Sequence, residues 1–180
     1  DVPFNYDPDI QLRDLKIGYL KNDFDSVRDD KANSDSTLAV LRSLGANLIP
    51  IELPKYPVND LSFILSAEAG AAFDDLTRNG KDDLLVRQMK DARPNVFRAS
   101  RFIPAVEYIQ ANRIRCLLIQ DMQKLMDDLD VYVAPSLSGD NLLLTNLTGH
   151  PCVVLPNGFS KEGSPTSISF VGKLFGEAKL

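Results

Sequence analysis

The chain has 180 residues, of which 44% are hydrophobic and 25% charged, and its formal net charge is −5. This length suffices for one domain with a substantial core, which would bury about 70% of the surface of the unfolded chain. The acidic residues are spread along the chain, whereas a nucleic-acid surface needs clustered Lys and Arg. The apolar runs are far shorter than the ~20 residues of a membrane-spanning helix. The sequence therefore predicts a globular protein that neither binds nucleic acid directly nor enters a membrane.

The first quarter of the chain predicts a strand, a helix and a second strand. Residues 15–20 alternate between apolar and polar side chains, which is typical of a strand. A helix is expected over residues 33–44, followed by Gly45 at a position suited to positive φ. Residues 47–53 indicate the second strand. Two strands joined through a helix predict parallel pairing.

Helices are expected to dominate the middle of the chain. Residues 59–77 predict a helix with apolar residues on one face, and residues 81–92 predict a shorter, charged helix. Pro94 is expected to break the helical pattern. Pro104 suits the first turn of a helix, and it opens the longest one, which is expected to end near residue 129.

Three further strands are expected in the last third of the chain. Val131–Ala134 and Cys152–Leu155 are short and fully apolar, which is typical of buried parallel strands. Residues 166–171 predict a strand that follows a surface turn. Asn146–Pro151 is expected to be a loop between buried strands, in which Gly149 permits positive φ.

The sequence offers little for nucleophilic or metal-based chemistry of its own. The single histidine, His150, lies between a glycine and a proline, and no acidic residue is patterned to orient it. Cys116 and Cys152 each lie in apolar sequence and are expected to be buried free thiols. One histidine and two distant cysteines do not predict a metal site, and no cofactor is expected.

Six runs that keep one order along the chain carry a resemblance to a known family. They are Leu38–Pro54, Ser66–Ala69, Phe102–Arg115, Asp130–Pro135, Asn146–Gly158 and Gly163–Ala178. Together they resemble the amidase signature family. The resemblance implies an α/β fold with a mixed, partly parallel sheet flanked by helices, corresponding to the C-terminal portion of the amidase signature fold. Residues 1–180 are expected to form a single domain, a C-terminal fragment of a larger amidase domain.

Members of this family hydrolyse carboxamides with a lysine and two serines, and the nucleophilic serine lies in a Gly/Ser-rich stretch whose backbone amides form the oxyanion hole. Ser136–Gly139 is the nearest imitation here, and it lacks the dense glycines that let backbone donors approach an oxyanion. The resemblance places the catalytic segment ahead of this chain. Residues 174–180 begin a helix that stops without a cap, and both ends of the chain are expected to be cuts. No catalytic residue is assigned, and the chain alone is expected to be inactive.

The substrate-binding candidates come from polar residues that would line a pocket at the carboxyl edge of the sheet. They include Asp140, Asn141 and Asn146. In relatives that act on glutamine, an acidic residue and an upstream arginine hold the substrate amino acid. The resemblance puts Asp140 near the acidic position, and Arg98 or Arg101 at that of the arginine.

Three interpretations of the whole chain stay open. The leading one is part of an amidase that acts on a small-molecule amide together with the remainder of the amidase chain. The second is the A subunit of a tRNA-dependent amidotransferase, and the third is a non-catalytic α/β binding domain. A homodimer is left open, and a cytoplasmic location is favoured only weakly by the two unpaired cysteines.

Overall fold

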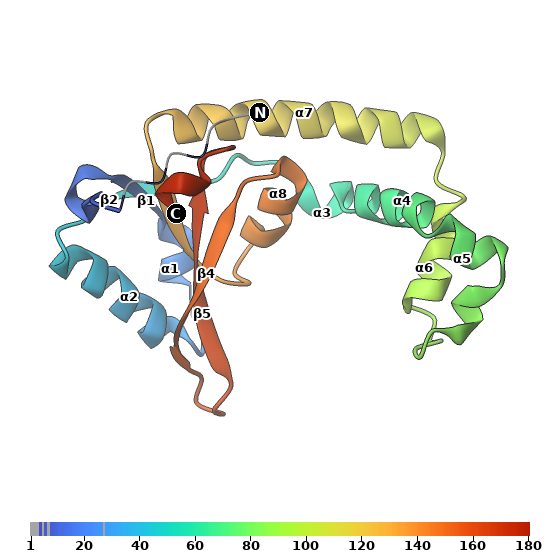
Figure 1. Cartoon of the computed structure of the whole chain (residues 1–180), viewed down its shortest axis with the longest axis horizontal. Helices are drawn as coiled ribbons and strands as arrows, with labels where there is room; N and C mark the ends of the chain where they lie inside the picture. The colour runs from blue at the N-terminus through green and yellow to red at the C-terminus, as the bar shows by residue number, and fades with distance from the viewer. Residues whose placement is uncertain (1–3, 5, 7, 27) are drawn as a thin grey trace. The chain divides into compact units, whose positions relative to one another are not determined.

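The structure is a computed structural model that describes residues 4, 6, 8–26 and 28–180. Its residues form two compact units (Figure 1). The sheet unit combines the chain up to Tyr56 with Leu118–Leu180, and the helical unit is Pro57–Leu117. The expectation of a single domain over residues 1–180 stays a prediction, and each unit is described by itself.

The sheet unit is built on a mixed sheet. Its strands are β1 (Lys16–Leu20), β2 (Asn47–Ile51), β3 (Val131–Pro135), β4 (Cys152–Phe159) and β5 (Pro165–Gly172). Its helices are α1 (Lys21–Asp25), α2 (Lys31–Ser43), α8 (Asn141–Thr148) and the short 3-10 helices η1 (Leu12–Asp14) and η3 (Glu177–Lys179). Over the described residues the strand order is β2-β1-β3-β5-β4. Strands β2, β1 and β3 are parallel, whereas β5 runs antiparallel to both β3 and β4. The predicted mixed, partly parallel sheet with flanking helices is confirmed.

One face of the sheet packs against α2. Leu38 and Leu41 of α2 join Ile17, Val133 and Ile168 of the strands in one buried apolar cluster. Because successive strand residues point to opposite faces, Tyr132 lies on the other face, where it is fully buried. Each face of the central strands is therefore covered, as the apolar sequence of β3 requires.

The predicted strands and helix of the first quarter are confirmed, including the parallel pairing of β1 with β2 and the positive φ of 91° at Gly45. The prediction that Cys152–Leu155 is a buried parallel strand is wrong. Strand β4 lies at the sheet edge, antiparallel to β5, and Val154 is 55% exposed. The short turn between β4 and β5 enforces antiparallel pairing, because parallel strands need a long crossover. Cys116 and Cys152 are free as expected, but both are exposed.

The helical unit consists of short helices. They are α3 (Val58–Leu61), α4 (Phe63–Ala72), α5 (Asp74–Arg78), the 3-10 helix η2 (Lys81–Leu84), α6 (Arg93–Ser100) and the first part of α7 (Ala105–Asp127). The long helix is confirmed as α7, which continues into the sheet unit from Leu118. None of the helices among the described residues has the length and hydropathy to cross a membrane.

The remaining helix predictions for this unit were wrong in part. The helix expected over residues 59–77 is divided into α3, α4 and α5, and the helix expected over residues 81–92 is reduced to η2. Pro94 does not end a helix but lies in the first turn of α6, where a proline loses no hydrogen bond.

Candidate functional site

The segment after β3 and the helix after β1 meet at one edge of the sheet. Strands β1 and β3 are parallel, so their carboxyl ends lie on the same side. At Gly139, where φ is 53°, a Cβ atom would lie 3.1 Å from both carboxylate oxygens of Asp23 in α1. Leu137 has a φ of 61° and is 83% exposed. This turn therefore combines left-handed backbone, unusual for leucine, with a close approach to a carboxylate.

Asp23 is the titratable group that this edge encloses. Burial raises the pKa of its carboxyl, and the charge of Asp140 adds to that rise, while Arg28 and a hydrogen bond from Ser138 oppose it. Its Oδ2 atom is buried without a hydrogen-bond partner. Sequence reasoning missed Asp23, because it follows β1 in a polar stretch that was not expected to be helical. A carboxyl directly after a buried strand was the signal available.

Asn141 forms an internal hydrogen bond with Tyr132. It is 5% exposed, and its Oδ1 accepts a hydrogen bond of 2.7 Å from the hydroxyl of Tyr132. Burial raises the pKa of Tyr132 far above its ordinary value, so the hydroxyl keeps its proton and donates. This contact joins β3 to the first turn of α8.

Asp140 and Asn146 are the exposed members of the predicted set. Asp140 stands at the N-cap of α8, and Asn146 lies within that helix. The prediction of a loop from Asn146 to Pro151 was therefore wrong for its first part. Leu144 and Leu147 are buried at helical spacing, and Gly149 ends the helix with the expected positive φ, here 80°.

Ser136 and Ser169 of this edge bond to one another, whereas Ser138 bonds to the carboxylate of Asp23. The Oγ atoms of Ser136 and Ser169 are 2.8 Å apart. His150, the histidine of the chain, binds through Nδ1 to the Thr148 hydroxyl at 2.7 Å. Its Nε2 is buried without a partner, and burial lowers its pKa. The described part of this edge thus offers carboxylate, amide and hydroxyl groups suited to binding a polar ligand, and none of its described serines bonds to His150.

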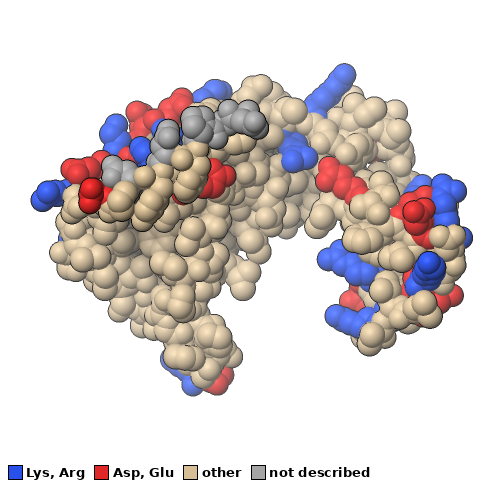
Figure 2. All heavy atoms as spheres, in the orientation of Figure 1, with Lys and Arg blue, Asp and Glu red and all other residues tan. Residues whose placement is uncertain are grey.

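The two predicted arginines belong to the helical unit, where both form ion pairs. A guanidinium nitrogen of Arg98 lies 2.6 Å from Oδ2 of Asp82 and 2.7 Å from Oδ1 of Asp83. Asp82 is only 2% exposed, so Arg98 balances a buried charge, although the Asp82 contact lacks the geometry of a hydrogen bond. Arg101 pairs with Asp74. Figure 2 accordingly shows acidic and basic side chains intermixed over this unit.

Comparison with models of protein families gives no match. Curated relatives are nonetheless found over almost the whole chain. The glutamyl-tRNA(Gln) amidotransferase A subunit of Prochlorococcus marinus is 25% identical over 94% of this chain and 44% of its own length. Its counterpart in Neisseria gonorrhoeae is 26% identical over 98% of this chain and 45% of its own length. The A subunit of Trichormus variabilis is 28% identical over 96% of this chain and 44% of its own length. The chain therefore spans less than half the length of these relatives.

Solved structures share the fold at lower sequence identity. Allophanate hydrolase of Kluyveromyces lactis matches 98% of this chain and 31% of its own, with a TM-score of 0.72 and 18% identity. A bacterial aryl acylamidase of the amidase signature family matches 92% of this chain and 41% of its own, with a TM-score of 0.71 and 19% identity. The chain is thus similar in sequence to amidotransferase A subunits and shares the fold of an enzyme of the amidase signature family.

Proposed function

We propose that this chain is part of an amidase that hydrolyses a carboxamide by acyl-serine chemistry. The observation that carries the proposal is the alignment of nearly the whole chain with amidotransferase A subunits. The fold shared with an aryl acylamidase supports it. The chain matches 44% of the length of such a relative, so the catalytic lysine and serines of the proposed enzyme would lie in the part outside these 180 residues.

In this proposal the carboxyl edge of the sheet unit supplies a wall of the substrate pocket. Asp140 presents an exposed carboxylate at the start of α8, and Asn146 presents an amide further along that helix. A carboxylate there would bind the ammonium group of an amino-acid amide, and an amide would bind a polar substrate group. Asn141 would act as a positioning residue, since its hydrogen bond with Tyr132 fixes the first turn of α8.

Arg98 and Arg101 remain candidates for contact with the substrate carboxylate. Each already pairs with an aspartate in the helical unit. Arg98 is 42% exposed at its side chain, so part of its guanidinium is open to a second partner. Arginine has five N–H donors and can donate hydrogen bonds to an internal carboxylate and to a ligand at the same time.

A second candidate is an amidotransferase A subunit that releases ammonia from glutamine. It is favoured by the relatives, whose names are those of glutamyl-tRNA(Gln) amidotransferase A subunits. Such a protein would work with partner subunits, and it would need Asp140 for the amino group of glutamine. The two candidates differ in their preferred substrate, glutamine or a simple amide. A cytoplasmic location stays a prediction under both.

Asp140→Asn in the intact enzyme tests whether Asp140 lines the substrate pocket. Loss of one charged hydrogen bond is expected to raise the KM for an amino-acid amide about tenfold. The KM for a simple aliphatic amide is expected to stay unchanged, because that substrate has no ammonium group. Steady-state ammonia release from both substrates measures the two KM values. Asp128→Asn, at the exposed residue that directly follows α7, is the control. Equal effects on both amides would remove Asp140 from the pocket.

The amidase proposal itself is tested by ammonia release from a simple carboxamide. The 180-residue chain alone is expected to release none, since the proposal assigns its nucleophile to another segment. The intact enzyme is expected to release ammonia and to form a covalent acyl intermediate on serine, visible by mass spectrometry. Turnover by the 180 residues alone would contradict the proposed division of roles.

A further inference from the structure

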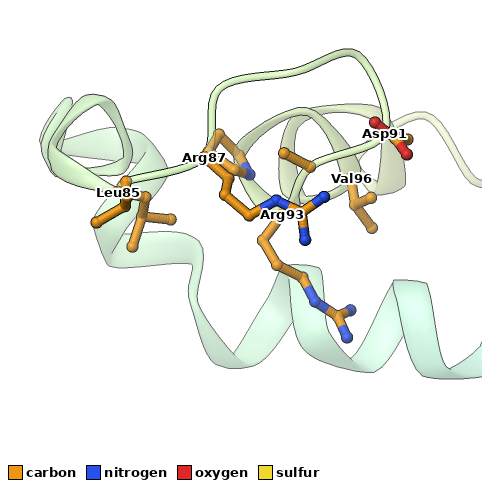
Figure 3. Close-up of a pocket in the computed structure, with 8 residues that line it drawn as sticks. Leu85, Arg87, Asp91, Arg93 and Val96 are labelled. Carbon is orange, nitrogen blue, oxygen red and sulfur yellow. The ribbon is translucent and has the colours of Figure 1, made fainter. Parts of the chain in front are cut away.

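The helical unit contains a cavity of about 440 Å³ between η2 and α6 (Figure 3). Its walls combine apolar side chains with charged ones. The residues that matter here are Leu85, Arg87, Asp91, Arg93, Pro94 and Val96. A volume of this size lies within the range of small-molecule sites in proteins, about 300–1,000 Å³.

The two arginines of this cavity have no carboxylate partner among the described residues. Arg87 donates one weak hydrogen bond, of 3.6 Å, to the sulfur of Met89. No hydrogen bond or ion pair joins Arg93 to any residue that the structure describes. Of the other arginines of the helical unit, Arg78, Arg98, Arg101 and Arg115 each reach an aspartate or glutamate, whereas the exposed Arg113 forms no ion pair among the described residues. The cavity thus gathers guanidinium groups whose donors are not used internally.

The one acidic residue of the cavity does not neutralise them. Figure 3 shows Asp91 at the far end of the loop, apart from the guanidinium groups of Arg87 and Arg93. No ion pair is formed between Asp91 and either arginine. Its charge disfavours a multiply charged anion such as phosphate, which would be repelled more strongly than a single carboxylate.

The apolar wall restricts the ligand further. Leu85 and Val96 are partly exposed and offer apolar surface, whose burial gains free energy only when a ligand brings an apolar group of its own. Planar guanidinium groups match the geometry of a carboxylate and can bind it with paired hydrogen bonds. We propose that this cavity binds a monocarboxylate carried on a small apolar group, with Arg87 and Arg93 holding the carboxylate.

The inference stands apart from the proposed amidase function, because it uses only residues of the helical unit and involves no hydrolysis. Titration of the 180-residue chain with phenylacetate at constant ionic strength tests it. Backbone amide resonances of residues 85–96 are expected to shift and to saturate. Phenylacetamide has the same shape without the charge, and it is expected to bind at least about tenfold more weakly, as is inorganic phosphate.

Variants then assign the arginines. Arg87→Gln and Arg93→Gln are each expected to weaken phenylacetate binding about tenfold, and Arg93→Lys to weaken it less, because lysine keeps the charge but not the paired donors. Arg113→Gln, an exposed arginine of α7 outside the cavity lining, is the matched control and is expected to change nothing.

Circular dichroism and the unshifted amide resonances establish that each variant is folded. Unchanged affinity in both glutamine variants would overturn the proposal. So would equal binding of phenylacetamide or phosphate, or the absence of saturable shifts in residues 85–96. Each of these outcomes would leave the amidase proposal standing, since no amide hydrolysis is measured.

Discussion

The hydrogen bond between Tyr132 and Asn141 fixes the junction of β3 and α8 at a single point. Both residues are buried, with exposed fractions of 0% and 5%. Tyr132→Phe would leave the Oδ1 atom of Asn141 buried without a donor, at a cost of about 1–3 kcal/mol in the free energy of unfolding. Urea unfolding measures this loss, and Tyr6→Phe on an exposed tyrosine is the control. An unchanged unfolding free energy in Tyr132→Phe would show that the junction does not depend on this contact.

His150 makes stability depend on pH in a predictable direction. Burial lowers its pKa below the ordinary value of 6.5, so the folded chain favours the neutral ring. As the pH drops from the unfolded pKa of about 6.5 toward the lower folded pKa, the unfolded chain binds more protons and stability falls; below the folded pKa this contribution levels off. His150 contributes at most about 1.4 kcal/mol per pH unit to the slope of the unfolding free energy against pH. His150→Gln is expected to flatten the dependence between pH 7 and pH 5, as followed by urea unfolding. An identical slope in the variant would contradict the assignment.

Individual residues differ in how well the sequence predicts them. Gly45 and Gly149 have the positive φ expected of them, because the tolerance of glycine for this backbone conformation is a local property. The exposure of Cys152 was mispredicted, because burial depends on which strand lies at the sheet edge. Asp23 was missed for a similar reason: its environment comes from Gly139, more than a hundred residues away in the chain.

Among the elements, the contact between α4 and α6 depends on a residue without a side chain. A Cβ atom at Gly70 would lie 1.9 Å from Oγ and 2.9 Å from Cβ of Ser100. Gly70→Ala gains about 0.5–1 kcal/mol in helix propensity, but overpacking of this kind costs about 1–3 kcal/mol, so a net loss of up to about 2.5 kcal/mol is expected.

Hydrogen exchange of the α4 and α6 amides measures the effect of Gly70→Ala within the helical unit. The double variant Gly70→Ala, Ser100→Gly removes both clashing atoms and is expected to restore part of the protection. If Gly70→Ala alone protects these amides better than the unaltered chain, propensity outweighs packing and the contact is looser than described.

Periodic elements were predicted better than irregular ones. Strands β1, β2, β3 and helix α7 have strong local patterns, and their bounds agree with expectation within a few residues. The helix expected over residues 59–77 failed because its apolar spacing is shared by three short helices that turn between them. Helix α6 was not expected, since a proline in a first turn and a proline that breaks a helix look alike in sequence.

At the scale of the whole molecule, the family resemblance predicted more of the fold than any single candidate site did. Six weak runs in one order indicated the amidase signature family, and both the A-subunit relatives and the shared fold agree with it. The substrate-binding residues were harder to predict, because ion pairs such as Arg98 with Asp82 depend on tertiary contacts. The division into a sheet unit and a helical unit also has no marker in the composition of the chain.

The amidase proposed above has its nucleophile in a segment other than these 180 residues. The most direct measurement is to sequence the transcript that encodes the chain, upstream of these 180 residues. We predict a continuous reading frame that contains a Gly/Ser-rich stretch, with a lysine further ahead, as acyl-serine chemistry of this family requires. An upstream frame that continues without such a stretch, or a start codon directly before the chain, would contradict the claim.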